Sequence, residues 1–202
     1  MKRLLLLPFL LIALALSPTQ TPKTDPLQSV VTLNSGDGFC SAFSVNEEKG
    51  IFMTADHCLD ADLSINNHKV DILATNGIVD LALIHADVHD PALLLGDQPP
   101  QGSEVELIGH VKTNPVSFTL NILGITQSSE DAPFLFLFGG SQLHAIGGMS
   151  GGPIIDAKGH VVSVILGYVG EDANIAGDTL GVFYPAMVTA YKVVDEYVAV
   201  VK

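Results

Sequence analysis

The chain has 202 residues, of which 48% are hydrophobic, with 19 glycines, 11 prolines and a formal net charge of −13 at pH 7. This composition is typical of a loop-rich globular protein that is long enough to bury a sizeable core, and it argues against a disordered chain. Only nine Lys and Arg residues are present, so the chain lacks the basic patch of a nucleic-acid-binding protein, and its acidity would repel anionic membrane surfaces.

The first 15 residues have the features of a secretory signal peptide. Lys2 and Arg3 precede an apolar run from Leu4 to Leu16 that is interrupted by Pro8. The run is shorter than the roughly 20 apolar residues of a membrane-spanning helix. A small-x-small pattern ends at residue 15, so residues 1–15 are predicted to be cleaved from an exported protein, with an uncleaved membrane anchor as the alternative.

Residues 16–29 contain three prolines and no periodicity, and they are predicted to be a disordered spacer. Short β-branched and apolar runs separated by turn residues then predict antiparallel strands. Residues 90–103 are rich in proline and turn residues, and they are interpreted as a crossing between two halves with a boundary near Gln98. The predicted strands are 30–33, 39–45, 51–54, 63–65, 69–74 and 81–84, then 105–111, 116–127, 134–138, 154–155, 161–168 and 182–184.

Two segments of the second half have distinctive apolar patterns. Phe134–Phe138 is apolar over five residues, which predicts a strand buried on both faces. After Ala186 the apolar residues recur at helical spacing, which predicts an amphipathic C-terminal α-helix that packs on the second half, with partner binding as the alternative. The recurring residues are Met187, Ala190, Tyr191, Val194, Tyr197, Val198 and Val201.

The sequence Ala145–Pro153, AIGGMSGGP, surrounds Ser150 with four glycines. Glycine allows a tight turn that would hold the serine hydroxyl outward. A serine hydroxyl becomes a nucleophile only beside a general base that is held by a third group, with N–H donors aimed at the developing oxyanion. A histidine and a carboxylate are therefore expected elsewhere in the chain.

Both residue types are present in suitable contexts. His57 lies in the box Thr54-Ala55-Asp56-His57-Cys58, and Asp80 heads an apolar run in the box Val79–Ile84. The order His, Asp, Ser and these three boxes together resemble the trypsin-like, chymotrypsin-fold serine endopeptidases. The resemblance covers about residues 30–184, and it is to compact bacterial or viral members that include the protease domain of the high-temperature-requirement family.

The resemblance implies an all-β chymotrypsin fold of two six-stranded-type antiparallel β-barrels with a C-terminal α-helix. Residues 30–98 would form the N-terminal barrel, with His57 and Asp80. Residues 99–202 would form the C-terminal barrel, with Ser150 and the helix.

The resemblance also implies a role for each residue of the three boxes. His57 would be the general base, Asp80 would orient it and Ser150 would be the nucleophile. Asp56 is the rival carboxylate, but adjacent side chains diverge in an extended segment, so Asp80 is favoured. The N–H groups of Gly148 and Ser150 would form the oxyanion hole.

One position departs from the family pattern. Members that are activated by zymogen cleavage carry an acidic residue where this chain has Met149. Activity is therefore expected not to depend on a liberated α-amino group.

By the same resemblance, His144 lies near the base of the substrate pocket, and Ile165 and Gly167 lie on its wall. No carboxylate is present at His144, so a preference for Arg or Lys is not supported. A neutral pocket favours small or hydrophobic side chains, whereas a protonated His144 would favour an acidic one. A His144 that is hydrogen-bonded inside the barrel is the alternative.

Cys40 and Cys58 are the only cysteines. A single pair fits an exported protein with one disulfide, and the resemblance places such a bridge beside the catalytic histidine. Two buried free thiols are the alternative.

No metal or cofactor is predicted. The metalloprotease pattern and the nucleotide-binding glycine patterns are absent from the sequence, and the resemblance implies no cofactor. His85, Asp87, His89 and Asp90 offer zinc-type ligands, but their alternation favours a solvated strand end.

The leading interpretation is an exported serine endopeptidase, secreted or periplasmic, that hydrolyses peptide bonds through an acyl-enzyme. Its partners would be protein or peptide substrates, with no nucleic acid and no stable membrane span after signal removal. The alternatives are a non-catalytic protein of the same fold that binds a partner, and an esterase with the same triad.

Overall fold

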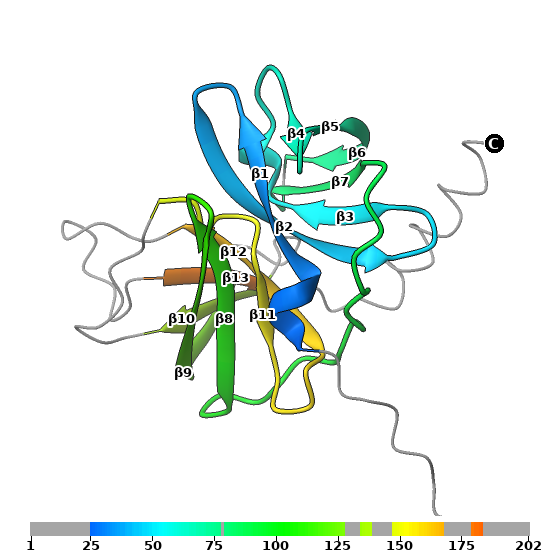
Figure 1. Ribbon diagram of the computed structural model, residues 1–202. Helices are drawn as coiled ribbons and strands as arrows, with labels where there is room; N and C mark the ends of the chain where they lie inside the picture. The colour runs from blue at the N-terminus through cyan, green and yellow to red at the C-terminus, as the bar shows by residue number, and fades with distance from the viewer. Residues whose placement is uncertain (1–24, 78, 128–133, 139–146, 168–178, 184–202) are drawn as a thin grey trace, which may run out of the picture.

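The computed structural model describes residues 25–77, 79–127, 134–138, 147–167 and 179–183. Antiparallel strands dominate these residues and form two units (Figure 1). The N-terminal sheet has the strand order β5-β4-β1-β2-β3-β7-β6, and the C-terminal barrel is closed in the order β10-β13-β12-β11-β8-β9. The all-β class and the trypsin-like arrangement of two curled antiparallel units are confirmed.

The strands of the N-terminal sheet are β1 (Val30–Ser35), β2 (Gly38–Asn46), β3 (Ile51–Thr54), β4 (Ser64–Ile65), β5 (His68–Lys69), β6 (Asp71–Asn76) and β7 (Leu81–His85). Those of the C-terminal barrel are β8 (Glu104–Val111), β9 (Asn114–Gln127), β10 (Phe134–Phe138), β11 (Pro153–Ile155), β12 (Val161–Gly167) and β13 (Thr179–Phe183).

The N-terminal sheet has seven strands in the described residues, whereas six were expected. The predicted strand 69–74 is divided at Val70, because this buried residue donates its N–H to the Leu63 carbonyl at 3.1 Å. The chain before it pairs with β4, and the chain after it pairs with β7. The residue pattern of 69–74 cannot reveal such a change of partner, since both pieces keep the strand period.

Strand β10 differs from its expected burial on both faces. Phe136 and Phe138 are fully buried in the barrel core, whereas Leu135 and Leu137 are partly exposed. β10 lies between β9 and β13, and successive side chains of a strand point to opposite faces. Only the phenylalanine face is therefore inside the barrel.

The chain enters the first sheet through a short 3₁₀ turn, η1 (Pro26–Ser29). Asp25 Oδ1 accepts the Leu27 N–H at 3.1 Å, and Ser29 is fully buried. The last four residues of the expected spacer are thus ordered in the structure, because an Asp cap and a proline in the first turn stabilise it. The predicted signal segment 1–15 and the predicted C-terminal helix lie outside the described residues, and the domain boundaries stay predictions.

The two units share hydrophobic packing. One core cluster lies within the N-terminal sheet, and the other fills the barrel and extends to Phe43 and Met53 of the sheet. Strands β1 and β2 run from the N-terminal sheet onto β8 (Figure 1). The Thr32 hydroxyl also donates to the Lys112 carbonyl across this junction at 2.8 Å.

The crossing segment binds both units along its length. The Leu93 N–H donates to the Ser44 carbonyl of β2 at 2.9 Å, and the Ser44 hydroxyl donates to the Asp90 carbonyl at 2.8 Å. Further on, the Gly96 N–H donates to the Val161 carbonyl of β12 at 2.8 Å. The proline-rich crossing is therefore tied to the two units that it connects.

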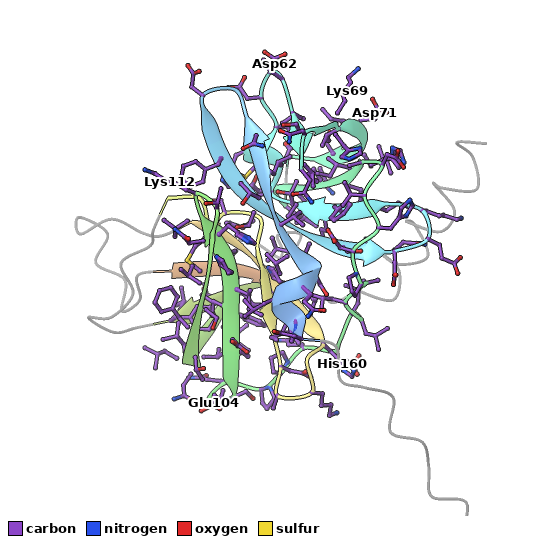
Figure 2. The ribbon with its side chains drawn as sticks, in the orientation of Figure 1. Asp62, Lys69, Asp71, Glu104, Lys112 and His160 are labelled. Atoms are coloured by element: carbon purple, nitrogen blue, oxygen red, sulfur yellow. A yellow bond between two sulfur atoms is a disulfide. The ribbon has the colours of Figure 1, made fainter. Side chains whose placement is uncertain are left out.

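Polar and charged side chains lie at the outer ends of the two units. Figure 2 shows Asp62, Lys69 and Asp71 at the outer end of the N-terminal sheet, and Glu104 and His160 at the opposite end of the barrel. Among the described residues, no helix has the length and apolar character needed to span a membrane.

The predicted disulfide is present. Cys40 of β2 is bonded to Cys58, with a Cα–Cα distance of 6.0 Å and a sequence separation of 18. It joins the middle of the N-terminal sheet to the chain that follows β3.

We expect reduction of this disulfide to lower the free energy of unfolding by about 3 kcal/mol, because a loop of this length gains conformational freedom in the unfolded chain. For a protein of this size, the melting temperature should fall by roughly 6–12 °C. Thermal denaturation with and without a reductant measures this. The double variant Cys40→Ala, Cys58→Ala should melt at the lower temperature, and its melting temperature should not change when the reductant is added. An unchanged melting temperature on reduction of the native protein would contradict the prediction.

His110 of β8 is a buried polar residue. Its side chain is 8% exposed, and its Nδ1 atom has no hydrogen-bond partner in the described part of the chain. Burial removes the ring from water and lowers its pKa below the usual value. The folded state therefore disfavours the charged ring.

The unfolded chain binds a proton at His110 below about pH 6.5, whereas the folded chain binds it only at a lower pH. The stability contribution of the neutral ring is therefore present above about pH 6.5 and is lost as the pH falls. Urea titrations of the native protein and of His110→Phe at about pH 7.5 and 5.5 measure this. The native protein should lose more stability on acidification, by at most about 1.4 kcal/mol per pH unit for one proton; equal losses would show that His110 does not contribute.

Candidate active site

His57 lies in a single 3₁₀ turn, η2 (Asp56–Cys58), directly after the fully buried strand β3. Ala55 is extended, and the turn then brings His57 to the surface, where 44% of its side chain is exposed. The disulfide of Cys58 anchors the turn to β2. The ring is thus reachable from solvent while its backbone is held on two sides.

The Asp80 carboxylate contacts His57 twice. Asp80 Oδ2 lies 2.7 Å from His57 Nδ1, and Asp80 Oδ1 accepts the His57 backbone N–H at 2.9 Å. Asp80 immediately precedes β7, whose pairing with β3 brings it beside the turn. Contact with both the ring and the backbone of one residue fixes the ring orientation and leaves Nε2 for another partner.

The rival carboxylate Asp56 points elsewhere. A Cβ atom placed on Gly77 would lie 3.4 Å from Asp56 Oδ2, so this carboxylate lies toward the turn before Asp80. The two acidic side chains near His57 therefore have different surroundings, and Asp80 is the one against the ring.

Ser150 lies in the serine loop, which we define as residues 147–152. Gly148 has a φ of +106° and Gly151 a φ of +82°, values that residues with a side chain rarely adopt. A Cβ on Gly148 would overlap the Phe39 ring, and a Cβ on Gly151 would overlap the Ser41 carbonyl. The glycines thus allow the loop backbone to pack directly on the N-terminal sheet.

Backbone hydrogen bonds hold the serine loop on both sides. The Gly151 N–H donates to the Ile165 carbonyl of β12 at 2.7 Å, and the Ile165 N–H donates to the Gly152 carbonyl at 2.8 Å. From the other unit, the Ser41 N–H of β2 donates to the Ser150 carbonyl at 2.7 Å. The loop is therefore clamped between the barrel and the N-terminal sheet.

The backbone of Ser150 lies close to His57. Cys58 Sγ is 3.8 Å from the Ser150 carbonyl oxygen, and a His57 ring nitrogen and both disulfide sulfurs lie within 4.8 Å of one another. The half-buried Ser150 hydroxyl donates to the Leu166 carbonyl at 3.4 Å, and within the described ranges it has no hydrogen bond to His57. Such bonds are often long in free enzymes and tighten in the substrate complex.

These sulfurs and the His57 ring are the one group of potential metal ligands found in the described part of the chain. The two sulfurs are bonded to each other, so neither is a thiolate that could bind a metal ion.

The N–H groups of Gly148 and Ser150 flank Met149. The Met149 carbonyl accepts the Gly152 N–H at 3.0 Å, so the Ser150 N–H, which is trans to that carbonyl in the same peptide, points away from Gly152. Among the residues that the structure describes, neither N–H donates to a protein acceptor.

The structure gives only part of the predicted substrate pocket. Ile165 is 4% exposed and belongs to the barrel core, and Gly167, at the end of β12, has open space where a Cβ would lie. His144 lies outside the described residues. The assignment of these residues to a pocket stays a prediction.

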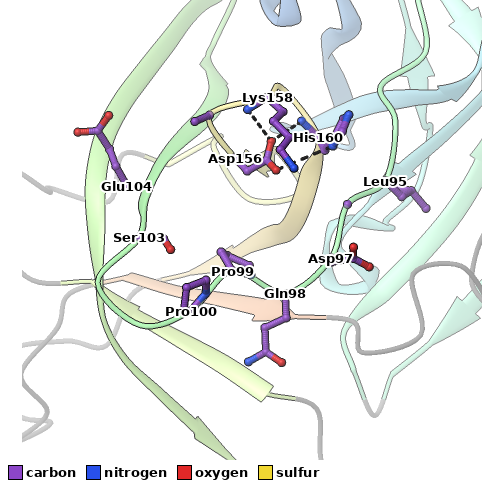
Figure 3. Close-up of a pocket in the computed structure, with 12 residues that line it drawn as sticks. Leu95, Asp97, Gln98, Pro99, Pro100, Ser103, Glu104, Asp156, Lys158 and His160 are labelled. Carbon is purple, nitrogen blue, oxygen red and sulfur yellow. Dashed lines mark hydrogen bonds and ion pairs between the residues drawn. The ribbon is translucent and has the colours of Figure 1, made fainter.

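A cavity of about 700 Å³ lies elsewhere, between the crossing segment and the turn after β11 (Figure 3). Asp156 Oδ1 accepts the N–H groups of Lys158 and His160 at 2.9 Å each, which shapes one wall of this cavity. Its lining contains none of the predicted site residues. The site around His57 is thus separate from this cavity.

Ser41 is a residue whose importance the sequence analysis missed. Its N–H binds the Ser150 carbonyl, and its hydroxyl donates to the Gly148 carbonyl at 2.7 Å. In the sequence it is a small residue next to Cys40, which carries no signal for a contact with a loop more than one hundred residues away.

Comparisons with known proteins give the family of the chain. Residues 40–164, more than half of the chain, match the family model of the trypsin-like peptidase domain. No match was found among curated proteins.

Three solved structures illustrate the likeness in fold. The active form of the Rv3671c protease from M. tuberculosis has a TM-score of 0.68 and 16% identity, over 81% of this chain and 79% of that chain. A serine endoprotease from Yersinia pestis has a TM-score of 0.65 and 15% identity, over 86% and 64%. The HtrA-type protease AlgW with a tripeptide has a TM-score of 0.67 and 16% identity, over 82% and 60%.

At such low identity the solved structures show the fold, and the family model adds the sequence evidence. The chain belongs to the trypsin-like peptidase domain family, and it is a serine endopeptidase.

Proposed function

We propose that this endopeptidase hydrolyses peptide bonds with the triad His57, Asp80 and Ser150 through an acyl-enzyme intermediate. The observation that carries the proposal is the double contact of the Asp80 carboxylate with the His57 ring and backbone, beside the clamped backbone of Ser150. A carboxylate on Nδ1 holds the tautomer in which Nε2 is free to accept a proton.

In the first half of the reaction, the Ser150 hydroxyl attacks the substrate carbonyl carbon while His57 Nε2 takes its proton. The oxyanion that develops accepts hydrogen bonds from the N–H groups of Gly148 and Ser150. His57 then gives the proton to the leaving amine as the C–N bond breaks. Water attacks the acyl-enzyme by the same proton path and releases the second product.

The substrate class is protein or peptide, as the family implies. The AlgW structure contains a tripeptide, which supports a peptide-binding groove in a protein of this fold. We propose a pocket for small or hydrophobic side chains near His144, Ile165 and Gly167, since position 144 carries no carboxylate for a basic one, with an acidic side chain facing a protonated His144 as the alternative. The family match supports this function over the esterase and the non-catalytic binding protein.

We further propose that the protein is exported to the periplasm or secreted, with residues 1–15 as its signal and two barrel domains over 30–98 and 99–202. The Cys40–Cys58 disulfide supports this compartment, because such bridges persist mainly in oxidising surroundings.

The nucleophile is tested with a fluorophosphonate probe, which phosphonylates an activated serine. We expect the native protein and the control Ser64→Ala to be labelled, and Ser150→Ala to be unlabelled although it is folded. Equal labelling of Ser150→Ala, or no labelling of folded native protein, would contradict the proposal. Profiling with a peptide library and a matched set of esters separates a protease from an esterase.

The orienting carboxylate is tested by comparing Asp80→Asn with Asp56→Asn. We expect Asp80→Asn to lower kcat by roughly 10⁴-fold, because an amide favours the wrong tautomer of the histidine while it keeps the bond to the His57 N–H. Asp56→Asn should retain activity close to the native value. Peptide hydrolysis assays measure both, and the reverse order of effects would assign the role to Asp56.

A further inference from the structure

We infer that Ser41 is a positioning residue for the oxyanion hole: its hydroxyl holds the Gly148 carbonyl and so directs the Gly148 N–H. The inference rests on the proposed function, in which Gly148 and Ser150 bind the oxyanion. It adds a residue from the N-terminal sheet to a feature that otherwise belongs to the C-terminal barrel.

The Ser41 hydroxyl has a single allowed orientation. Ser41 is fully buried on β2. Its Oγ accepts the backbone N–H of His110 at 2.7 Å and donates to the Gly148 carbonyl at 2.7 Å. A hydroxyl has one proton to donate, and with the His110 N–H in one acceptor position that proton is directed to Gly148.

The other polar groups of Ser41 strengthen this arrangement. Its N–H donates to the Ser150 carbonyl at 2.7 Å, and its carbonyl accepts the Thr54 hydroxyl at 2.8 Å. Ser41 therefore contacts the carbonyls on both sides of Met149, one through its backbone and one through its side chain. Thr54 in turn holds the Ser41 backbone in place from β3.

The bond to Gly148 acts on the oxyanion hole through the peptide plane. The Gly148 carbonyl and the Met149 N–H share one planar peptide, so holding the carbonyl fixes the rotation about the Gly148 Cα–C bond. Gly148 has a φ of +106°, and the direction of its own N–H depends on both rotations. The bond from Ser41 thus restricts ψ of Gly148, one of the two backbone rotations that would let this N–H turn away from the substrate.

The second oxyanion donor is held independently. The Gly152 N–H binds the Met149 carbonyl at 3.0 Å, which sets the direction of the Ser150 N–H. Loss of the Ser41 hydroxyl should therefore disturb the Gly148 donor and leave the Ser150 donor in place. Loss of one oxyanion donor costs about 10²–10³-fold in kcat, and misdirection of one donor should cost roughly 10–100-fold.

The test compares Ser41→Ala with Ser44→Ala. Ser44 lies on the same strand, is also fully buried, and donates its hydroxyl to the Asp90 carbonyl at 2.8 Å, away from the serine loop. Each variant loses one hydroxyl-to-carbonyl bond, and Ser41→Ala also loses the acceptor of the His110 N–H, so both should lower the melting temperature, Ser41→Ala by more. We expect kcat of Ser41→Ala to fall 10–100-fold with KM within about twofold, and kcat of Ser44→Ala to stay within about twofold of the native value.

A peptide aldehyde supplies a readout that a purely structural role would not change. It adds to the nucleophilic serine as a hemiacetal whose oxygen occupies the oxyanion hole, so its Ki should rise by the same factor as kcat/KM falls. Ser41→Cys keeps a weaker donor at the same position and should be intermediate in both measurements. If Ser41→Ala does not fold, kcat and the aldehyde Ki of Ser41→Cys test the proposal in its place.

The outcomes separate the two proposals. An equal kcat for Ser41→Ala and Ser44→Ala in an active enzyme, or an unchanged aldehyde Ki, would overturn the role of Ser41 alone. Absence of hydrolysis and of probe labelling in the native protein would overturn the proposed function and the role of Ser41 with it.

Discussion

The hydrogen bond from the Ser41 N–H to the Ser150 carbonyl joins the two halves of the molecule at the site, and the other features are arranged around it. The same strand, β2, carries Cys40, whose disulfide holds the turn of His57, and Phe43, which reaches into the shared core. One strand therefore sets the position of the His57 turn and of the serine loop. The His57 turn and the serine loop are thus placed by a common rigid element.

Close backbone packing is the condition for this junction. The serine loop lies directly against β2 and β8, and methyl groups on Gly148, Gly151 or Gly152 would overlap atoms of those strands. The two glycines with positive φ also let the loop reverse direction without steric cost. The glycine-rich sequence is thus required twice, once for the turn and once for the approach of the strands that hold it.

A side-chain contact, rather than backbone packing, positions the histidine of the site. Asp80 immediately precedes β7 and contacts the ring and the backbone of His57, so a single carboxylate fixes the position of the ring. The ring stays partly exposed, as access to substrate requires. The buried His110 has the opposite environment, since desolvation lowers the pKa of its ring while its backbone N–H donates to the Ser41 hydroxyl oxygen. Two histidines in one chain therefore act in different ways because their burial differs.

Local sequence determined much of this protein: the all-β class, strand β3 with the bounds Ile51–Thr54, the pair Cys40 and Cys58, and the boxes around His57, Asp80 and Ser150. These features depend on residue period, turn chemistry and short motifs, which neighbouring residues encode. Tertiary structure alone decided the division of a strand at Val70, the partly exposed leucine face of β10, and the contacts of Ser41 with the serine loop. Each of these depends on which strand lies next to which, and a pairing between distant segments leaves no mark in the pattern of either one alone.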